Sequence, residues 1–144
     1  MIYYVDKNSL EHFTFGGTSS ASFNFIIVEK DNLKSFENDF ELISVPGRNG
    51  DLIISNNRKK NKEINIEAYI DLEGLKRDAK TISAEIINWL QGELKYKKLT
   101  FSDDLTNYMA IVPGEIEIYE EVESLLNVKF KFSCKEVNIN DNSL

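Results

Sequence analysis

Alternation of apolar and polar residues is the feature that most constrains the fold of this chain. In LNVKFKFSC, residues 126–134, every second residue from Leu126 to Cys134 is apolar, while Lys129 and Lys131 occupy positions between them. Successive side chains of a β-strand point to opposite faces, so this period of two predicts a strand with one buried and one solvated face. The chain is therefore expected to build sheets.

The same period recurs along most of the chain. It is clear in ASFNFIIVEK (21–30), KEINIEAYI (62–70) and EIEIY (115–119), and shorter strands are expected in KKLTF (97–101) and NYMAIV (107–112). Half-buried strands of this kind, separated by polar turns, are typical of antiparallel sheets. The sequence therefore predicts a mostly antiparallel β-sandwich.

One segment follows a helical period instead. Between residues 71 and 92, apolar residues recur at spacings of three and four: Leu72, Leu75, Ala79, Ile82, Ile86 and Trp89. This spacing predicts one long α-helix over about 72–91. Asp71 is expected to cap its N-terminus and Gly92 to adopt a left-handed conformation at its end. Glu73 and Arg77 are expected to form an ion pair on its surface.

The apolar stripe of this helix needs a surface to cover it. The predicted sheet is the available partner, so we expect the helix to pack on the sheet through Leu75, Ile82, Ile86 and Trp89. The predicted fold class is thus α+β, a mostly antiparallel β-sandwich flanked by one long α-helix.

The strongest turn signal lies in SVPGRNGDL, residues 44–52. Its Asn-Gly pair favours a tight hairpin, and strand-like residues flank it on both sides. A tight turn does not need the Pro-Gly-Arg sequence that precedes the pair, so the turn alone does not explain the motif. The residues of the motif are Pro46, Gly47, Arg48 and Gly50.

A basic cluster follows this motif by a few residues. It consists of Arg58, Lys59, Lys60 and Lys62, on a chain whose formal net charge is −7. A solvated loop tip is the ordinary explanation of such a run, and a functional one needs an acidic counterpart. The acidic segment Glu115 to Glu123 is the counterpart by charge.

Length and charge limit the function classes. With 144 residues, the chain is expected to form a single domain over 1–144, with a polar C-terminal tail at about 136–144. The net charge of −7 and the pI near 4.8 disfavour a nucleic-acid binder, which normally has a basic face. No apolar run reaches the roughly 18 residues of a membrane span, and the N-terminus does not resemble a signal peptide.

The sequence predicts no catalytic, cofactor or metal site, and we expect a protein that is not an enzyme. It holds one histidine, His12, and one cysteine, Cys134, which excludes sites with two imidazoles and an internal disulfide. The pair Asp103-Asp104 lacks the ligand spacing of a calcium loop. Glu115 to Glu123 fits a solvated acidic face, and Gly-rich nucleotide or hydrolase motifs are absent.

Several blocks of sequence follow one another in a recognisable order. They are FTFGGTSSASFNFIIVEK near the start, VPGRNGDL after a strand, INWLQ at the end of the helix, KLTFSDDLTNYMAIV and the final alternating strand. In order and spacing, over roughly residues 10–135, they resemble the N-terminal domain of siphophage distal tail proteins (Dit). No single block carries the resemblance alone.

The resemblance implies a structural hub of the phage tail tip. Such proteins form a hexameric ring between the tail-tube protein and a tail-associated hub or fibre protein. They reside in the virion after assembly in the host cytoplasm. By analogy, the motif at Pro46 to Gly50 lies where the chain enters a projecting arm, over about 46–62, that reaches a neighbouring subunit. We then expect Leu52 and Ile54 of the arm to contact that subunit, while its basic tip, Arg58 to Lys62, faces an acidic surface there. Many members carry a further C-terminal domain, and the sequence given stops after the first, so it is either a short form or a truncated chain.

Two other interpretations stay open. A tail-tube protein has the same fold but polymerises into stacked rings. A carbohydrate-binding β-sandwich module would need exposed aromatic residues along a groove. The candidates for such a groove are Tyr3, Tyr4, Tyr69, Tyr96 and Tyr108.

Overall fold

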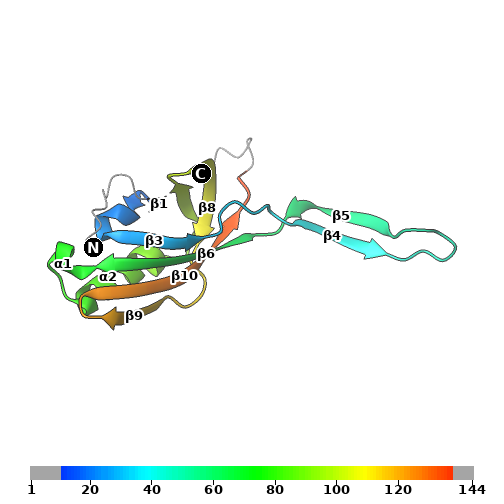
Figure 1. Ribbon diagram of the computed structural model, residues 1–144. Helices are drawn as coiled ribbons and strands as arrows, with labels where there is room; N and C mark the ends of the chain where they lie inside the picture. The colour runs from blue at the N-terminus through cyan, green and yellow to red at the C-terminus, as the bar shows by residue number, and fades with distance from the viewer. Residues whose placement is uncertain (1–10, 138–144) are drawn as a thin grey trace.

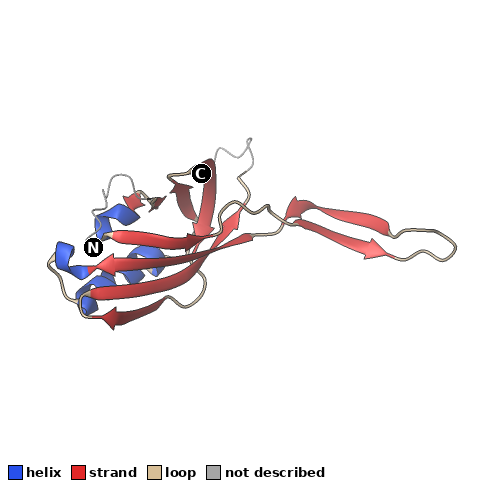
Figure 2. Ribbon diagram, viewed as in Figure 1, coloured by secondary structure: helices blue, strands red, loops and turns tan. Residues whose placement is uncertain are grey.

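The computed structural model describes residues 11–137, in which an antiparallel sheet of eight strands forms the body and a two-stranded hairpin projects from it (Figures 1 and 2). In spatial order the body strands are β2 (Thr18–Ser19), β1 (Phe13–Phe15), β7 (Lys97–Phe101), β8 (Asp104–Ile111), β10 (Leu125–Lys135), β6 (Lys62–Asp71) and β3 (Phe25–Lys30). β9 (Glu117–Val122) pairs with β10, and a 3-10 turn, Ser20–Phe23, follows β2. The prediction of a mostly antiparallel β-rich fold is confirmed.

β10 is the central strand of the body. One of its edges pairs with β6 from Leu125 opposite Asp71 to Cys134 opposite Lys62. Its other edge is shared, because β9 pairs with residues 125–129 and β8 with residues 133–135. The apolar sets of β6 and β10 are directly opposite one another in this register, so both strands bury the same face.

The aromatic core shows that the sheet folds back on itself. The ring centroid of Phe13 on β1 lies 5.8 Å from that of Phe25 on β3 and 5.4 Å from that of Phe132 on β10. β1 is adjacent to neither strand in the sheet. The half containing β1, β7 and β8 must therefore face the half containing β10, β6 and β3, with the core between them.

The prediction of one long helix is wrong. Within residues 72–91 the structure has two helices, α1 (Leu72–Leu75) and α2 (Ala79–Gln91), and Lys76 separates them in a left-handed conformation with φ of 53°. The carboxylate of Asp78 accepts a hydrogen bond from the Thr81 amide at 2.7 Å and starts α2 as a new N-cap. A side chain that caps a helix competes with continuation of the preceding one, which explains the break.

The ends of the two helices differ in part from the prediction. Asp71 does cap the first helix, with its carboxylate accepting from the Glu73 amide at 3.1 Å. Gly92 has φ of −62°, so it is not left-handed. Because the chain turns at Lys76, Arg77 pairs with Glu85 of α2 rather than with Glu73.

Helix α2 covers the open side of the folded sheet. Ile82 and Ile86 are buried, and Leu75 and Trp89 pack against the core as partly buried residues. The Trp89 ring stacks on Phe13 with centroids 5.6 Å apart, and its Nε1 donates to the Phe15 carbonyl at 2.9 Å. Trp89 thus joins the helix to β1 through both packing and a hydrogen bond.

Trp89→Ala is expected to lower the free energy of unfolding by about 3 kcal/mol, because it removes a large apolar contact and leaves the Phe15 carbonyl without its donor. Urea unfolding followed by circular dichroism measures the change. Ile87→Ala is the matched control, since Ile87 lies on the same helix but is 42% exposed. Its cost is expected to stay near 0.5 kcal/mol. Equal effects of the two substitutions would show that Trp89 does not hold the helix on the body.

Candidate functional site

The most distinctive surface of the described chain is a long hairpin arm, formed by β4 (Asn38–Ile43) and β5 (Leu52–Lys59). Among the described residues 11–137, the two strands pair with each other and with no other strand. The arm extends far from the body, and nearly every residue along it is exposed (Figures 1 and 2).

The arm has different boundaries from the predicted 46–62. The turn motif Pro46 to Gly50 lies at the tip, between β4 and β5, and not where the chain leaves the body. Gly47 and Gly50 have φ of 80° and 77°, which explains the need for glycine at the tip. The β-branched and aromatic residues of FELISV, residues 40–45, predicted a strand correctly but could not show that this strand lies in the arm rather than in the body.

The basic cluster lies at the base of the arm rather than at its tip. Arg58 pairs with Asp39 at 3.3 Å and Lys60 with Glu37 at 3.8 Å, both within the same chain. Lys62 belongs to β6 and is buried. Three of the four predicted interface cations therefore already have intramolecular contacts, and the expected attraction to a neighbour's acidic segment stays a prediction.

Both faces of the arm are apolar. Residues directly opposite in a hairpin share a face, so Leu42 and Ile53 define one face and Ile43 and Leu52 define the other. The first face (face one) comprises Phe40, Leu42 and Ile53, and the second (face two) comprises Ile43, Leu52 and Ile54. All six are between 38% and 68% exposed. The predicted contact residues Leu52 and Ile54 thus share face two.

A polar network lies where the arm joins the body. The Lys62 Nζ donates to the Asn32 carbonyl at 2.5 Å and to the Tyr108 hydroxyl at 3.2 Å. The Tyr108 hydroxyl donates in turn to Asp104 at 2.8 Å, and the side-chain Nδ2 of Asn32 donates to Asp104 at 3.2 Å. Burial lowers the pKa of Lys62 and raises that of Tyr108, where the hydrogen bond to Asp104 adds to the increase. Asp103, the neighbour of Asp104, pairs with Lys30.

Asp104 is ionised within this network. Its partial burial opposes ionisation, but hydrogen bonds from the backbone and side chain of Thr106 and from Tyr108 and Asn32 outweigh that effect and lower its pKa to about 2. The pair Asp103-Asp104 therefore serves internal contacts in this structure. Among the described residues no group of three or more histidine, cysteine, aspartate or glutamate side chains could hold a metal ion.

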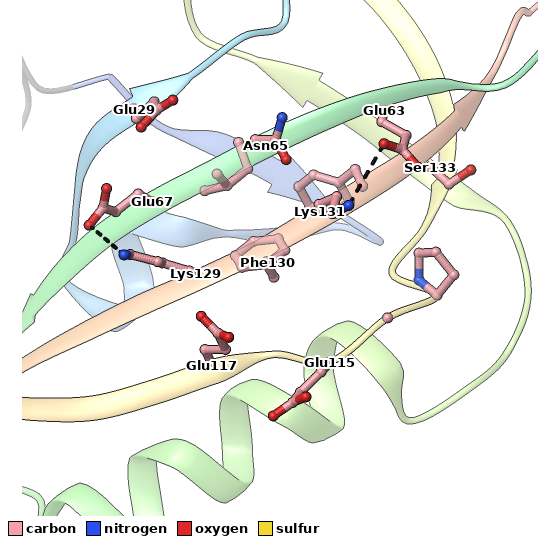
Figure 3. Close-up of a pocket in the computed structure, with 14 residues that line it drawn as sticks. Glu29, Glu63, Asn65, Glu67, Glu115, Glu117, Lys129, Phe130, Lys131 and Ser133 are labelled. Atoms are coloured by element: carbon pink, nitrogen blue, oxygen red, sulfur yellow. Dashed lines mark ion pairs between the residues drawn. The ribbon is translucent and has the colours of Figure 1, made fainter.

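A groove of about 620 Å³ runs over the outer face of β3, β6 and β10, beside the start of β9 and the loop that precedes it (Figure 3). Its charged residues are Glu29, Glu63, Glu67, Glu115, Glu117, Lys129 and Lys131. Lys129 pairs with Glu67 and Lys131 with Glu63, both at 3.8 Å. The groove keeps a net formal charge of −3, which disfavours binding of a polyanion such as DNA.

Of the five tyrosines in the carbohydrate hypothesis, the three that the structure describes do not form one platform. Tyr96 and Tyr108 border the same hollow beside β7, but the Tyr108 hydroxyl belongs to the network at the arm base. Tyr69 lies on β6 and donates to Glu121 at 3.3 Å. Tyr3 and Tyr4 lie outside the described residues.

The two residues with reactive side chains are placed in structural positions. The Cys134 thiol is buried in the core on β10, and burial raises its pKa to about 12. The His12 amide donates to the Ser102 hydroxyl at 2.9 Å and so joins the start of β1 to the β7–β8 turn. No helix in the described part of the chain is long and apolar enough to cross a membrane.

Comparison with known protein families decides the class of this protein. Residues 8–136 match the family described as phage tail protein N-terminal domain. The chain belongs to that family. A comparison with curated proteins finds no match.

The fold is similar to that of a solved phage protein, SPP1 Dit. The two superpose with a TM-score of 0.69 at 15% sequence identity, over 89% of this chain and 51% of SPP1 Dit. This chain thus spans about half the length of that protein. SPP1 Dit is described as a paradigm of the hub adsorption apparatus in phages that infect Gram-positive bacteria. The resemblance to distal tail proteins is confirmed, and both the family and this structural relative are phage tail proteins.

Asp104→Asn is expected to flatten the acid part of the stability profile. The folded-state pKa is about 2 and the ordinary value is 3.8, so ionised Asp104 stabilises the fold above about pH 4, and this contribution is lost as the pH falls towards 2. The variant should be less stable at neutral pH and lose less stability over that window. Urea unfolding at a series of pH values measures both. Asp51→Asn, at the exposed arm tip, is the control and should keep the parent slope.

Proposed function

We propose that this domain is a ring-forming structural component of a phage tail tip, which connects the tail tube to the proteins that act in host adhesion, and that it is not an enzyme. The observation that carries the proposal is the arm with two exposed apolar faces. Membership of the phage tail protein N-terminal domain family and the fold similarity to SPP1 Dit support the same role.

The exposed apolar surface of the arm is unusual for a protein that functions as a monomer. An isolated two-stranded hairpin is only marginally stable in water, and this one exposes apolar side chains on both faces. Contact with another subunit would remove both faces from water. At about 25 cal/mol per Å² of apolar area, even partial burial of six such side chains stabilises an interface by several kcal/mol.

An arm that reaches a different surface of the next copy makes a head-to-tail contact. Contacts of this type repeat from copy to copy and close into a ring when the rotation between copies closes. The hexameric number comes from the resemblance to distal tail proteins. A tail-tube protein would use the same fold to form stacked rings, and electron microscopy of the purified protein separates discrete rings from tubes.

The proposed partners are further copies of this chain, a tail-tube protein and a tail-associated hub or fibre protein, with the virion tail tip as the location. The acidic groove of Figure 3 favours neither sequence-specific nucleic-acid binding nor a carbohydrate site built on exposed aromatic rings. We rank the carbohydrate-binding module below the tail component for that reason.

Replacing residues 40–57 with Asn-Gly is expected to abolish ring assembly and leave the body folded. Asp39 and Arg58 are directly opposite in the hairpin, so a two-residue turn can join them. Light scattering and electron microscopy, with and without the tail-tube protein, measure assembly, and thermal unfolding measures the body. Rings formed by the shortened chain would contradict the proposal.

We expect each face of the arm to contribute separately. Leu42→Asn with Ile53→Asn alters face one, and Leu52→Asn with Ile54→Asn alters face two, with two substitutions in each variant. Each pair should weaken assembly at least tenfold while the melting temperature stays near that of the parent, since about 1.4 kcal/mol of lost contact corresponds to that factor. If one of the two variants assembled normally, the arm would lie on a single flat surface instead of being covered on both faces.

A further inference from the structure

Lys62 is a buried lysine at the root of the arm. It is the first residue of β6, three positions after β5 ends, and only 6% of the residue is exposed. Burial of a charged group costs several kcal/mol unless hydrogen bonds or other charges compensate. The contacts of Lys62 therefore show which interactions compensate the cost of burying its charge.

These contacts reach the other root of the arm. Its Nζ donates to the carbonyl of Asn32 and lies 5.4 Å from the ring centroid of Phe36. Asn32 and Phe36 belong to residues 31–37, the segment through which the chain leaves β3 and enters β4. One ammonium group thus joins the segment that leads into the arm to the strand that leads out of it.

The incoming segment is in turn attached to the body. Asn32 is 1% exposed, and its side-chain Nδ2 donates to Asp104 on β8. The carboxylate of Asp31 accepts hydrogen bonds from the backbone amide of Asn65 at 2.6 Å and from its side chain at 2.8 Å. Beyond this point, β4 and β5 pair only with each other. The direction of the arm is therefore set at its root.

We propose that Lys62 is the positioning residue that fixes the direction in which the arm leaves the body. A small change of angle at the root of the arm produces a larger displacement at its tip. β5 has eight residues, and at about 3.3 Å per residue the arm is roughly 26 Å long. A change of about 10° at the root then moves the tip by about 4 Å, close to the spacing between neighbouring strands. Such a shift would place the side chains of the arm out of register with a surface that receives them.

The consequence for assembly rests on the proposed function, but the direction of the arm can be measured without it. Ser44→Cys in the tip loop and Ala84→Cys on α2 introduce two exposed sites for spin labels. Cys134 is buried, with its pKa raised to about 12, so it should not react with the label. Pulsed electron paramagnetic resonance then gives the distribution of tip-to-body distances in the unassembled protein.

Lys62→Met keeps the apolar stem and removes the ammonium group. We expect a broader or shifted distance distribution for this variant, together with loss of ring assembly. Lys59→Met is the matched control, because Lys59 is an exposed lysine of the same segment, and its distribution should equal that of the parent. A purely structural role for Lys62 would lower the melting temperature and leave the distances unchanged, which would overturn the proposal.

A second variant decides the matter if Lys62→Met does not fold. Phe36→Ala removes the aromatic partner of Lys62 from the incoming segment and leaves β6 unaltered. It should also broaden the distribution, and a parent-like distribution would overturn the proposal. If the Lys62 and Phe36 variants kept the parent arm direction while the shortened-arm variant failed to assemble, the role of Lys62 would be contradicted and the role of the arm in the ring supported. A changed direction with normal assembly would support Lys62 and contradict the role of the arm in the ring.

Discussion

The pairing of β6 with β10 is the interaction on which the rest of the structure depends. The ladder runs without a register shift from Leu125 opposite Asp71 to Cys134 opposite Lys62. A slip by one residue would turn every apolar side chain of one strand towards solvent, so burial of the core fixes the register strongly. α1 begins directly after one end of β6, and the arm root lies at the other end. The ladder therefore determines where both the helices and the arm start.

The body and the arm differ in how much of their apolar surface is buried. In the body, strands bury one face against the folded-back sheet and helix α2, and aromatic rings such as Phe13 and Trp89 join the layers. In the arm, both faces of a two-stranded ribbon remain open to water. A surface of this kind raises the free energy of the free subunit, and association lowers it again. The arm thus favours assembly through the same apolar burial that stabilises the body.

Much of the fold could be predicted from the period of the sequence, because alternation reports which side of a strand is buried. It does not report which strands lie in the body and which in the arm, so the strand at FELISV was not assigned to the arm, and the turn motif was placed at the start of the arm instead of at its tip. The helix break at Lys76 was missed because the apolar stripe continues across it, although Asp78 is a strong N-cap signal.

The burial of Lys62 could also have been predicted from the sequence. In KEINIEAYI it shares the parity of Ile64 and Ile66, which places it on the buried face of the strand, but grouping it with Arg58 to Lys60 as a charge run hid that signal. Its partners Asn32, Phe36 and Tyr108 come from segments far apart in sequence, and only the folded chain brings them together. Local patterns predicted the elements, whereas the contacts that orient the arm depend on tertiary structure.

The chemistry of the root explains why a cation suits this position better than an apolar residue of similar length. The Asn32 carbonyl needs a hydrogen-bond donor once it is buried, and the Tyr108 hydroxyl can accept a hydrogen bond while donating its proton to Asp104. An apolar side chain would leave the carbonyl without its strongest donor, and the incoming segment could then adopt several arrangements of similar energy. A hydrophobic contact is non-directional, whereas a network of donors and acceptors selects one geometry. Because an arm about 26 Å long magnifies any angular error at its root, directional bonds are most useful where the arm leaves the body.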